Sequence, residues 1–373
     1  MNKKLQAGLL IGLTSTLAVA QDSESKVSIY GTADLAIAHY KTSGLSKTAM
    51  HVGGAGSRLG FLISEDLGKG TKVNSRLETG INMDNGTTSS TNGMAGRFWS
   101  RQAYIEVENS TYGAVRFGRL EGPTYAFFPK FDPMLLPAMD AWGVLTTLGS
   151  PAPGTPTGRG VSNGFLINPT QRTDNTIAYI SPRLGGVQAK LSYSLNEGNK
   201  NRAKFFEGSL DYVNGPITLG ALVVKASSTK AAGAAPASEG VTEYALGASY
   251  KKGWIHPYFT YIHRDKTDPA LGVNGQVMND RSESVTLLGA VIPVSQRGNL
   301  RMTYGQYSSG SDQRDAKSYG LAYTYDVSKK MMLMAAVTHL KQDSASKWPV
   351  FQSPSPNAGA NVSGVILGMT TRF

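Results

Sequence analysis

From residue 27 to its end, the chain consists of short segments in which apolar and polar residues alternate. In the last segment, 361–373, every second residue from Ser363 to Phe373 lies on one face, including Val365 and Leu367. A period of two is that of a β-strand. Strands with one apolar and one polar face suit a barrel with lipid outside and a lumen inside. The pattern therefore predicts strands that cross a membrane.

Sixteen such segments are bounded by Gly, Pro, Asn, Asp and Ser. Single-chain bacterial barrels have an even number of strands, which this number satisfies. The predicted strands are 27–39, 57–66, 71–82, 98–108, 113–119, 173–182, 186–196, 203–213, 216–226, 241–251, 253–264, 283–293, 298–307, 316–326, 330–341 and 361–373.

The connections between these segments alternate in length. Short periplasmic turns opposite long extracellular loops are typical of outer-membrane barrels, whereas a soluble β-sandwich has no reason for this regularity. The predicted fold is all-β, a 16-stranded antiparallel transmembrane β-barrel. Short connections include 67–70, 109–112, 183–185, 214–215, 252 and 327–329, and long ones include 40–56, 83–97, 120–172, 227–240, 265–282 and 342–360.

The first twenty residues have the features of a secretory signal peptide. Lys3 and Lys4 precede the apolar stretch 7–13, and the segment ends Ala18-Val19-Ala20, an A-x-A cleavage site. Nothing after it approaches the roughly 20 apolar residues of a membrane helix. We therefore expect residues 1–20 to direct export, and residues 21–373 to form one barrel domain in the outer membrane of a Gram-negative cell.

Composition narrows the function classes further. The chain has no cysteine, which excludes disulfides and thiolate metal sites. Lys3 and Lys4 account for two of its +11 formal charges, so residues 21–373 carry +9 and suit anionic partners. Export argues against nucleic acid. The five histidines show no spacing typical of metal ligands, and no nucleophile and base stand together, so we expect no cofactor, metal or catalytic residue.

Several basic residues fall on the polar, inward faces of the early strands. Arginines on a lumen wall create a positive potential that a low-dielectric barrel focuses, so anions would gather there. The alternative is that these arginines pair with the inward acids Asp34, Glu78 and Asp211 and are electrostatically quiet. The candidate residues are Arg58, Lys72, Arg76 and Arg116, with Arg172, Lys190 and Arg301 further round the barrel.

The longest loop, 120–172, contains more apolar and aromatic residues than a loop in water needs. Loops longer than about 12–15 residues are usually functional or disordered. We expect the first half of this loop to fold into the lumen. Its acids Asp132 and Asp140 would then face the arginines across a constriction.

Motifs distributed over the whole of residues 21–373 resemble the Gram-negative general diffusion porins of the β-proteobacterial type. The resemblance implies a 16-stranded barrel, a homotrimer and a third loop folded inward. It also implies that Arg58, an arginine at the start of the fourth strand, and Arg172 line the constriction. The motifs are Ser57-Arg58-Leu59-Gly60, 64–70, Arg116-Phe117-Gly118-Arg119, 175–179 with Ser181-Pro182, and the terminal Arg372-Phe373.

The fourth strand offers two arginines for that position, Arg97 and Arg101. Simple alternation puts Arg101 on the outward face with Ala103 and Ile105. A bulge, or a position at the strand end, must turn Arg101 inward if it lines the pore.

These observations predict a passive, water-filled outer-membrane channel for small hydrophilic solutes, selective for anions. The expected partners are two further copies of the chain, outer-membrane lipid and lipopolysaccharide, and small anions. Two alternatives stay open: a substrate-specific anion porin with a saturable site, and an outer-membrane enzyme or adhesin built on the same barrel.

Overall fold

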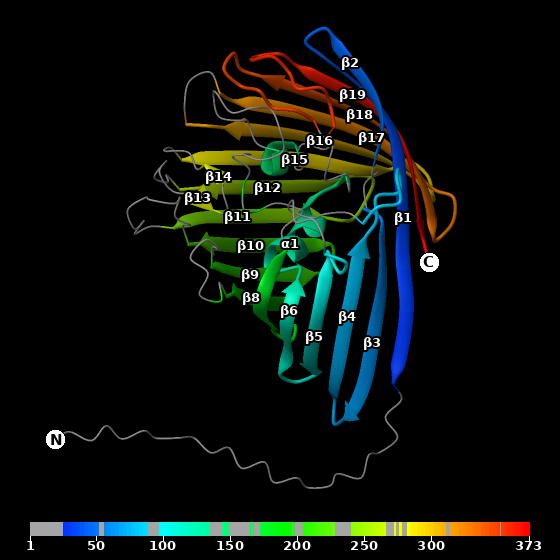
Figure 1. Ribbon diagram of the computed structural model, residues 1–373, viewed down its shortest axis with the longest axis vertical. Coiled ribbons are helices and arrows are strands. Elements are labelled where there is room, and N and C mark those ends of the chain that lie inside the picture. Colours follow the sequence, from blue (N-terminus) through cyan, green and yellow to red (C-terminus); the bar gives the residue numbers. More distant parts are fainter. Residues whose placement is uncertain are drawn as a thin grey trace, which may run out of the picture.

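A computed structural model describes residues 25–51, 56–88, 97–134, 144–148, 165, 167, 172–195, 197, 204–227, 240–265, 272–273, 276–277, 282–310, 314–350 and 352–373. The predicted signal peptide and Asp140 lie outside these residues. Strands curve around a central space that holds a short helix (Figure 1). None of the helices among the described residues is long and apolar enough to cross a membrane.

The first half of the barrel is an antiparallel series in which strands pair with their neighbours in sequence, except that β2 and β3 both pair with β1. Its strands are β1 (Lys26–Thr42), β2 (Leu45–His51), β3 (Arg58–Gly68), β4 (Thr71–Gly80), β5 (Gln102–Asn109), β6 (Gly113–Leu120), β7 (Thr173–Ile180), β8 (Val187–Ser194), β9 (Phe205–Asn214) and β10 (Ile217–Ala226).

The second half continues the series and returns to β1, so the sheet closes. Its strands are β11 (Val241–Tyr250), β12 (His256–Arg264), β15 (Glu283–Pro293), β16 (Gly298–Ser308), β17 (Ala316–Asp326), β18 (Met331–Gln342) and β19 (Val362–Arg372), and β13 (Gly272–Val273) and β14 (Gln276–Val277) form a separate hairpin.

The sheet has seventeen assigned strands but closes as a sixteen-stranded barrel. The reason is that β2 and β3 lie end to end along β1. Residues 36–42 of β1 pair with β2, and residues 26–32 pair with β3. The predicted sixteen-stranded antiparallel barrel is confirmed.

The first predicted loop, 40–56, is wrong for most of its length. β1 continues to Thr42, turns tightly at Ser43-Gly44, and returns as β2. The sequence concealed this hairpin because its outward residues include His39, Lys41 and Thr48 rather than apolar ones. His39 and Thr48 are hydrogen-bonded through Nδ1 and Oγ1 at 2.9 Å.

Alternation sorts the strand residues between the two faces of the barrel. Large apolar side chains on the outward face are highly exposed in the isolated chain, among them Ile105, Leu210 and Leu367 at 55, 56 and 58%. An apolar band of this kind suits contact with lipid acyl chains. Most charged residues of β3 to β6, among them Arg58, Arg76, Glu106 and Arg116, occupy the opposite, inward face.

A short helix, α1 (Pro123–Phe131), lies against the inner wall formed by β9 to β12. Glycines make room for it: an added Cβ at Gly220 or Gly247 would come within 2.6 or 2.5 Å of the Phe131 ring. The buried Glu207 of β9 accepts a hydrogen bond from the Thr124 amide at 2.8 Å. Beyond the helix, Pro133 packs in the same way against Gly289.

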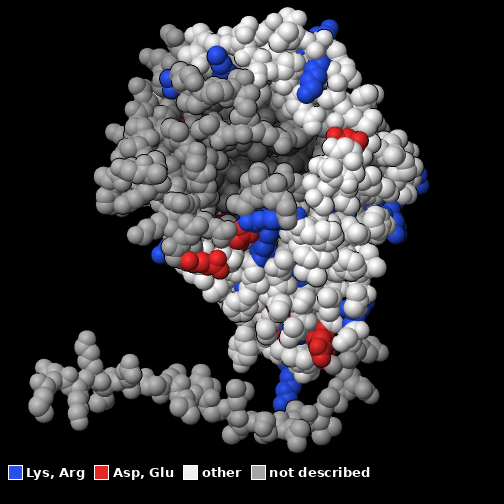
Figure 2. All heavy atoms as spheres, in the orientation of Figure 1, with Lys and Arg blue, Asp and Glu red and all other residues white. Residues whose placement is uncertain are grey.

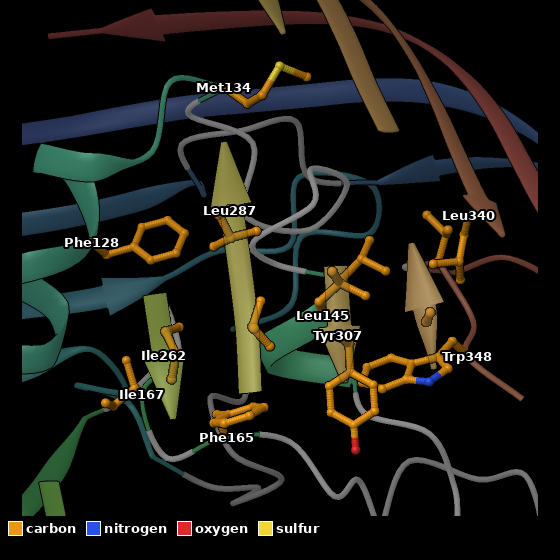
Figure 3. Close-up of a cluster of buried hydrophobic side chains, with 14 of the residues drawn as sticks. Phe128, Met134, Leu145, Phe165, Ile167, Ile262, Leu287, Tyr307, Leu340 and Trp348 are labelled. Carbon is orange, nitrogen blue, oxygen red and sulfur yellow. The ribbon is translucent and has the colours of Figure 1, made fainter. Parts of the chain in front are cut away.

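A further part of this loop, the π-helix η2 (Val144–Leu148), contacts β16 and β17. Leu145, Phe165 and Ile167 are buried with wall residues such as Ile262 and Leu287, and with Trp348 of the last long connection (Figure 3). The hydrophobic core of this barrel is therefore inside it, between the loops and the strands β9 to β19 together with β1. This core does not cover the wall from β3 to β7, where many inward side chains are charged.

Gly247→Ala should loosen the third loop while the barrel stays closed. Its Cβ would overlap the Phe131 ring, and overpacking of this kind typically costs about 1–3 kcal/mol. We expect faster proteolysis between residues 121 and 134, measured on the folded protein in detergent. Gly208→Ala is the matched control, because its Cβ meets nothing nearer than 3.4 Å. Equal proteolysis of both variants would contradict the proposed packing.

Candidate functional site

Four of the predicted basic residues share the inward face of neighbouring strands. The strand registers place Arg58 opposite Gly80, Lys72 opposite Glu108, Arg76 opposite Tyr104, and Arg116 opposite Glu106. Directly opposite residues in an antiparallel pair lie on the same face. The expected alternation of these strands thus produces one wall on which basic and acidic side chains meet.

At the long-loop end of this wall, three guanidiniums converge on two carboxylates. Arg101 Nε donates to Glu78 at 2.5 Å, and its Nη2 lies 3.2 Å from Glu121. Arg172 donates to the same Glu121 at 2.7 Å, and Arg58 Nε lies 3.9 Å from Glu78. The structure therefore brings together Arg58, Arg101 and Arg172.

Arg101 points inward because it precedes the regular part of β5. A turn joins the Ser100 amide to the Phe98 carbonyl, and the Arg101 amide then donates to the Glu78 carbonyl at 3.1 Å. Arg97 instead donates to Asp174 at 2.7 Å, which Arg119 also contacts. Of the two candidate arginines, Arg101 joins the inward cluster.

Burial acts on both of the nearly enclosed guanidiniums, with different results. For Arg101, burial disfavours the charged form, but the adjacent Tyr125, Glu121 and Glu78 outweigh it and raise the pKa. For Arg172, burial and the nearby Arg101 cation lower the pKa, against the opposing charge of Glu121. Arg101 is thus the more firmly held positive charge of this pair.

Deeper along the wall, two arginines lie against tyrosine rings. The guanidinium carbon of Arg76 lies 5.4 Å from the centre of the Tyr30 ring, and that of Arg116 lies 5.0 Å from Tyr104. These distances are within the range of cation–π contacts. Arg116 also pairs with Glu106. Arg76 has no carboxylate within 4.0 Å among the described residues.

Tyr30 links the two levels of the wall. Its ring crosses β3 above Gly60, where an added Cβ would lie 2.4 Å from the ring. Its hydroxyl donates to Glu78 at 2.7 Å. A side chain at residue 60 would therefore separate Tyr30 from both Glu78 and Arg76.

Most of the arginines on this wall are paired with carboxylates. Glu78, Glu106 and Glu121 lie within 4.0 Å of Arg58, Arg101, Arg116 and Arg172. The pairing that the sequence offered as an alternative is therefore extensive, whereas Arg76 lies against Tyr30 and has no carboxylate within 4.0 Å among the described residues. Figure 2 shows basic and acidic side chains close together at the edge of a hollow in the molecule.

Two predicted residues lie apart from this cluster. Lys72 is exposed next to the short turn between β3 and β4. Asp132 is buried against the opposite wall, where its carboxylate accepts a hydrogen bond from the Met134 amide at 2.9 Å. A constriction role for Asp132 and for the undescribed Asp140 stays a prediction.

Glu121 and Tyr125 were missed by the sequence analysis. Glu121 immediately follows β6, and Tyr125 stacks on Arg172 at 4.9 Å and hydrogen-bonds Arg101 at 3.2 Å. Their place in the sequence could have indicated them, because both residues stand at the start of the loop that was expected to turn inward.

Arg301, from β16, contacts that loop from the far side of the lumen and donates to the Pro133 carbonyl at 2.6 Å. Within the described residues, no group of three His, Asp or Glu side chains could hold a metal ion.

A closed sixteen-stranded barrel with an apolar outside and a charged inner wall defines a membrane channel. The sequence profile of the Gram-negative porins matches residues 7–345. The chain belongs to this family, and it is an outer-membrane porin, a passive diffusion channel.

Two curated relatives are porins of other bacteria. Outer membrane porin protein 32 of Delftia acidovorans is 26% identical over 383 residues, covering all of both chains. An outer membrane porin protein of Bordetella pertussis is 26% identical over 391 residues, covering 90% of this chain and 93% of the relative.

Solved structures share the fold. An anion-selective porin from Comamonas acidovorans has a TM-score of 0.76 and 24% identity, covering 94% of this chain and 100% of that one. The trimer form of OmpT of Vibrio cholerae has a TM-score of 0.59 and 14% identity, with coverages of 94% and 99%.

Glu78→Gln should strengthen anion preference and weaken the fold. The substitution removes a negative charge from beside Arg58 and Arg101, and breaking one side of a buried ion pair typically costs about 3–5 kcal/mol. We expect a reversal potential shifted in the anionic sense and a lower urea midpoint. Glu65→Gln, on the outward face of β3, is the control for both readouts. A shift in the cationic sense would contradict the assignment.

Proposed function

We propose that this porin prefers anions, and that the basic wall of β3 to β6 with Arg101 and Arg172 produces the preference. The observation that carries the proposal is the position of Arg76 on the inward face, where it rests on Tyr30 and has no carboxylate within 4.0 Å among the described residues. The Comamonas relative described as anion-selective adds support from the same fold.

The mechanism is electrostatic attraction in a narrowed aqueous path. Charges inside a barrel surrounded by lipid act through a low-dielectric wall, which strengthens their field in the lumen. Helix α1 occupies part of that lumen against β9 to β12. A permeating anion would exchange part of its hydration for brief contact with the guanidiniums, and a cation would be repelled.

We also infer transport without chemical conversion of the solute. Membership of a channel family supports this reading over an enzyme or adhesin. Export through residues 1–20 and assembly as a homotrimer complete the proposal. The OmpT structure described as a trimer has the same fold, which makes three copies the state to test first.

Neutralising Arg58 and Arg76 together should lower the anion preference. The double variant Arg58→Gln with Arg76→Gln keeps the Arg116 pair with Glu106 intact, which a charge reversal at Arg116 would disrupt. We expect the ratio of chloride to potassium permeability to fall by about fivefold, since a charge at ~4 Å in water is worth ~1 kcal/mol. The measurement is the reversal potential under a salt gradient in a planar bilayer.

The matched control is Arg58→Lys with Arg76→Lys, which keeps both charges. It should retain most of the wild-type preference. A Gln variant that folds and conducts with an unchanged reversal potential would overturn the role of this wall.

We propose that lipopolysaccharide contacts the outward face of β17 to β19 and β1 near the long loops. Lys317 of β17 stands directly opposite Lys341 of β18, and like charges so placed repel. Lys41 of β1 lies opposite Ser363 of β19. The outward face of these strands carries no acid along their pairing registers, and all three lysines are exposed. Phosphate groups would relieve the repulsion.

Lys317→Gln with Lys341→Gln should weaken lipopolysaccharide binding to the detergent-solubilised protein. A basic residue near an anionic membrane surface contributes about 1 kcal/mol, so we expect each substitution to weaken binding by about fivefold. Lys329→Gln with Lys330→Gln is the control, since both lysines are exposed at the short turn between β17 and β18. Equal affinities for the two double variants would exclude this contact.

A further inference from the structure

Asp211 on the inward face of β9 is surrounded by three cations from three separate elements. Lys130 of α1 donates to one carboxylate oxygen at 2.6 Å, and Arg183 donates to the other at 2.7 Å. Lys190 of β8 lies 3.8 Å from the oxygen that Lys130 already occupies. Among the described residues, Asp211 is therefore the one carboxylate within 4.0 Å of these three cations.

The arrangement turns its positive side toward the lumen. The Asp211 side chain is 2% exposed, whereas those of Lys190, Lys130 and Arg183 are 16, 23 and 37% exposed. A solute in the lumen would meet ammonium and guanidinium groups, with the carboxylate behind them. The group presents two surplus positive charges at a solvent-accessible surface.

Lys130 and Arg183 are each held in place by a further hydrogen bond. The Lys130 carbonyl accepts a hydrogen bond from Ser249 of β11 at 3.1 Å, at the end of a helix whose start is anchored by Glu207. Arg183 donates to the Gly186 carbonyl at 2.6 Å, within the short turn between β7 and β8. Preorganised charges of this kind bind a ligand with less loss of side-chain entropy.

This group is separate from the arginine cluster described above. The two share no residue. Arg101 and Arg172 stand at the long-loop ends of their strands, whereas Arg183 belongs to a short turn at the opposite end. A solute crossing the channel would pass the two groups in succession.

We propose that Lys130, Arg183 and Lys190 form a second anion site in the lumen, for small divalent oxyanions. Two surplus charges match two negative charges on the ligand, and oxygen atoms can accept hydrogen bonds from ammonium and guanidinium groups together. The proposal rests on the proposed function, because the ligand must first be admitted to the lumen. It adds a saturable step to an otherwise passive channel.

The test is the block of chloride conductance by hydrogen phosphate in a planar bilayer, at about pH 7, where divalent phosphate is abundant and the lysines are protonated. For the wild type, phosphate added on the short-turn side should reduce chloride current in a saturable manner. Lys190→Gln and Lys130→Gln should each raise the half-blocking concentration about fivefold, since ~1 kcal/mol corresponds to that factor. Lys190→Arg keeps the charge and should restore the wild-type value.

Lys225→Gln, on the outward face of β10, is the matched control and should block like the wild type. Succinate in place of phosphate tests whether any divalent oxyanion serves. Block by phosphate alone would overturn the general class, and equal half-blocking concentrations in the wild type and both Gln variants would overturn the site.

The outcome is distinguishable from failure of the proposed function. A wild-type channel with an anionic reversal potential but no change in block among the variants refutes only this site. A cationic reversal potential in the wild type refutes the anion preference itself. Having two independent Gln variants keeps the test decisive if one of them does not fold.

Discussion

Closure of the sheet is the constraint on which the rest of this structure depends. Backbone groups in a bilayer have no water to bond, so every strand needs two neighbours. The pairing of β1 with β19 supplies the last of these, over eleven residue pairs from Thr32 to Thr42. Closure also fixes which face is outside, because a shift by one residue would turn charged side chains toward lipid.

The interior of the barrel is divided by what the third loop covers. Phe131 fits against Gly220 and Gly247, and the buried loop residues continue that contact toward β17. Much of the opposite wall stays uncovered, and its arginines Arg58 and Arg116 remain partly accessible to water. The third loop packs against one side of the lumen and leaves charged residues on the other side, so its position accounts for both features.

Much of the fold and part of the site were predictable from the sequence. The period of two predicted the strand positions and the inward direction of Arg58, Arg76 and Arg116. The length of the connection predicted an inward loop beginning near Glu121. The β2 strand was missed because its outward residues are polar.

From the sequence, Arg101 could face inward only if a bulge or a position at the strand end turned it. The structure provides this through a backbone turn at Ser100. The sequence predicted that Lys190 and Asp211 face inward, but it gave no indication that Lys130 and Arg183 join them. Lys130 is 81 residues from Asp211, and only docking of α1 brings the two together.

The sequence by itself determined a closed barrel, its lipid face and the basic character of one inner wall, because alternation is a local property of each strand. Only the tertiary structure decided which charges remain uncompensated. Pairing depends on distances between side chains from different strands and loops, as with Glu121, which neutralises part of Arg101 and Arg172 together. Selectivity therefore depends on these long-range contacts, whereas the fold depends mainly on the local pattern.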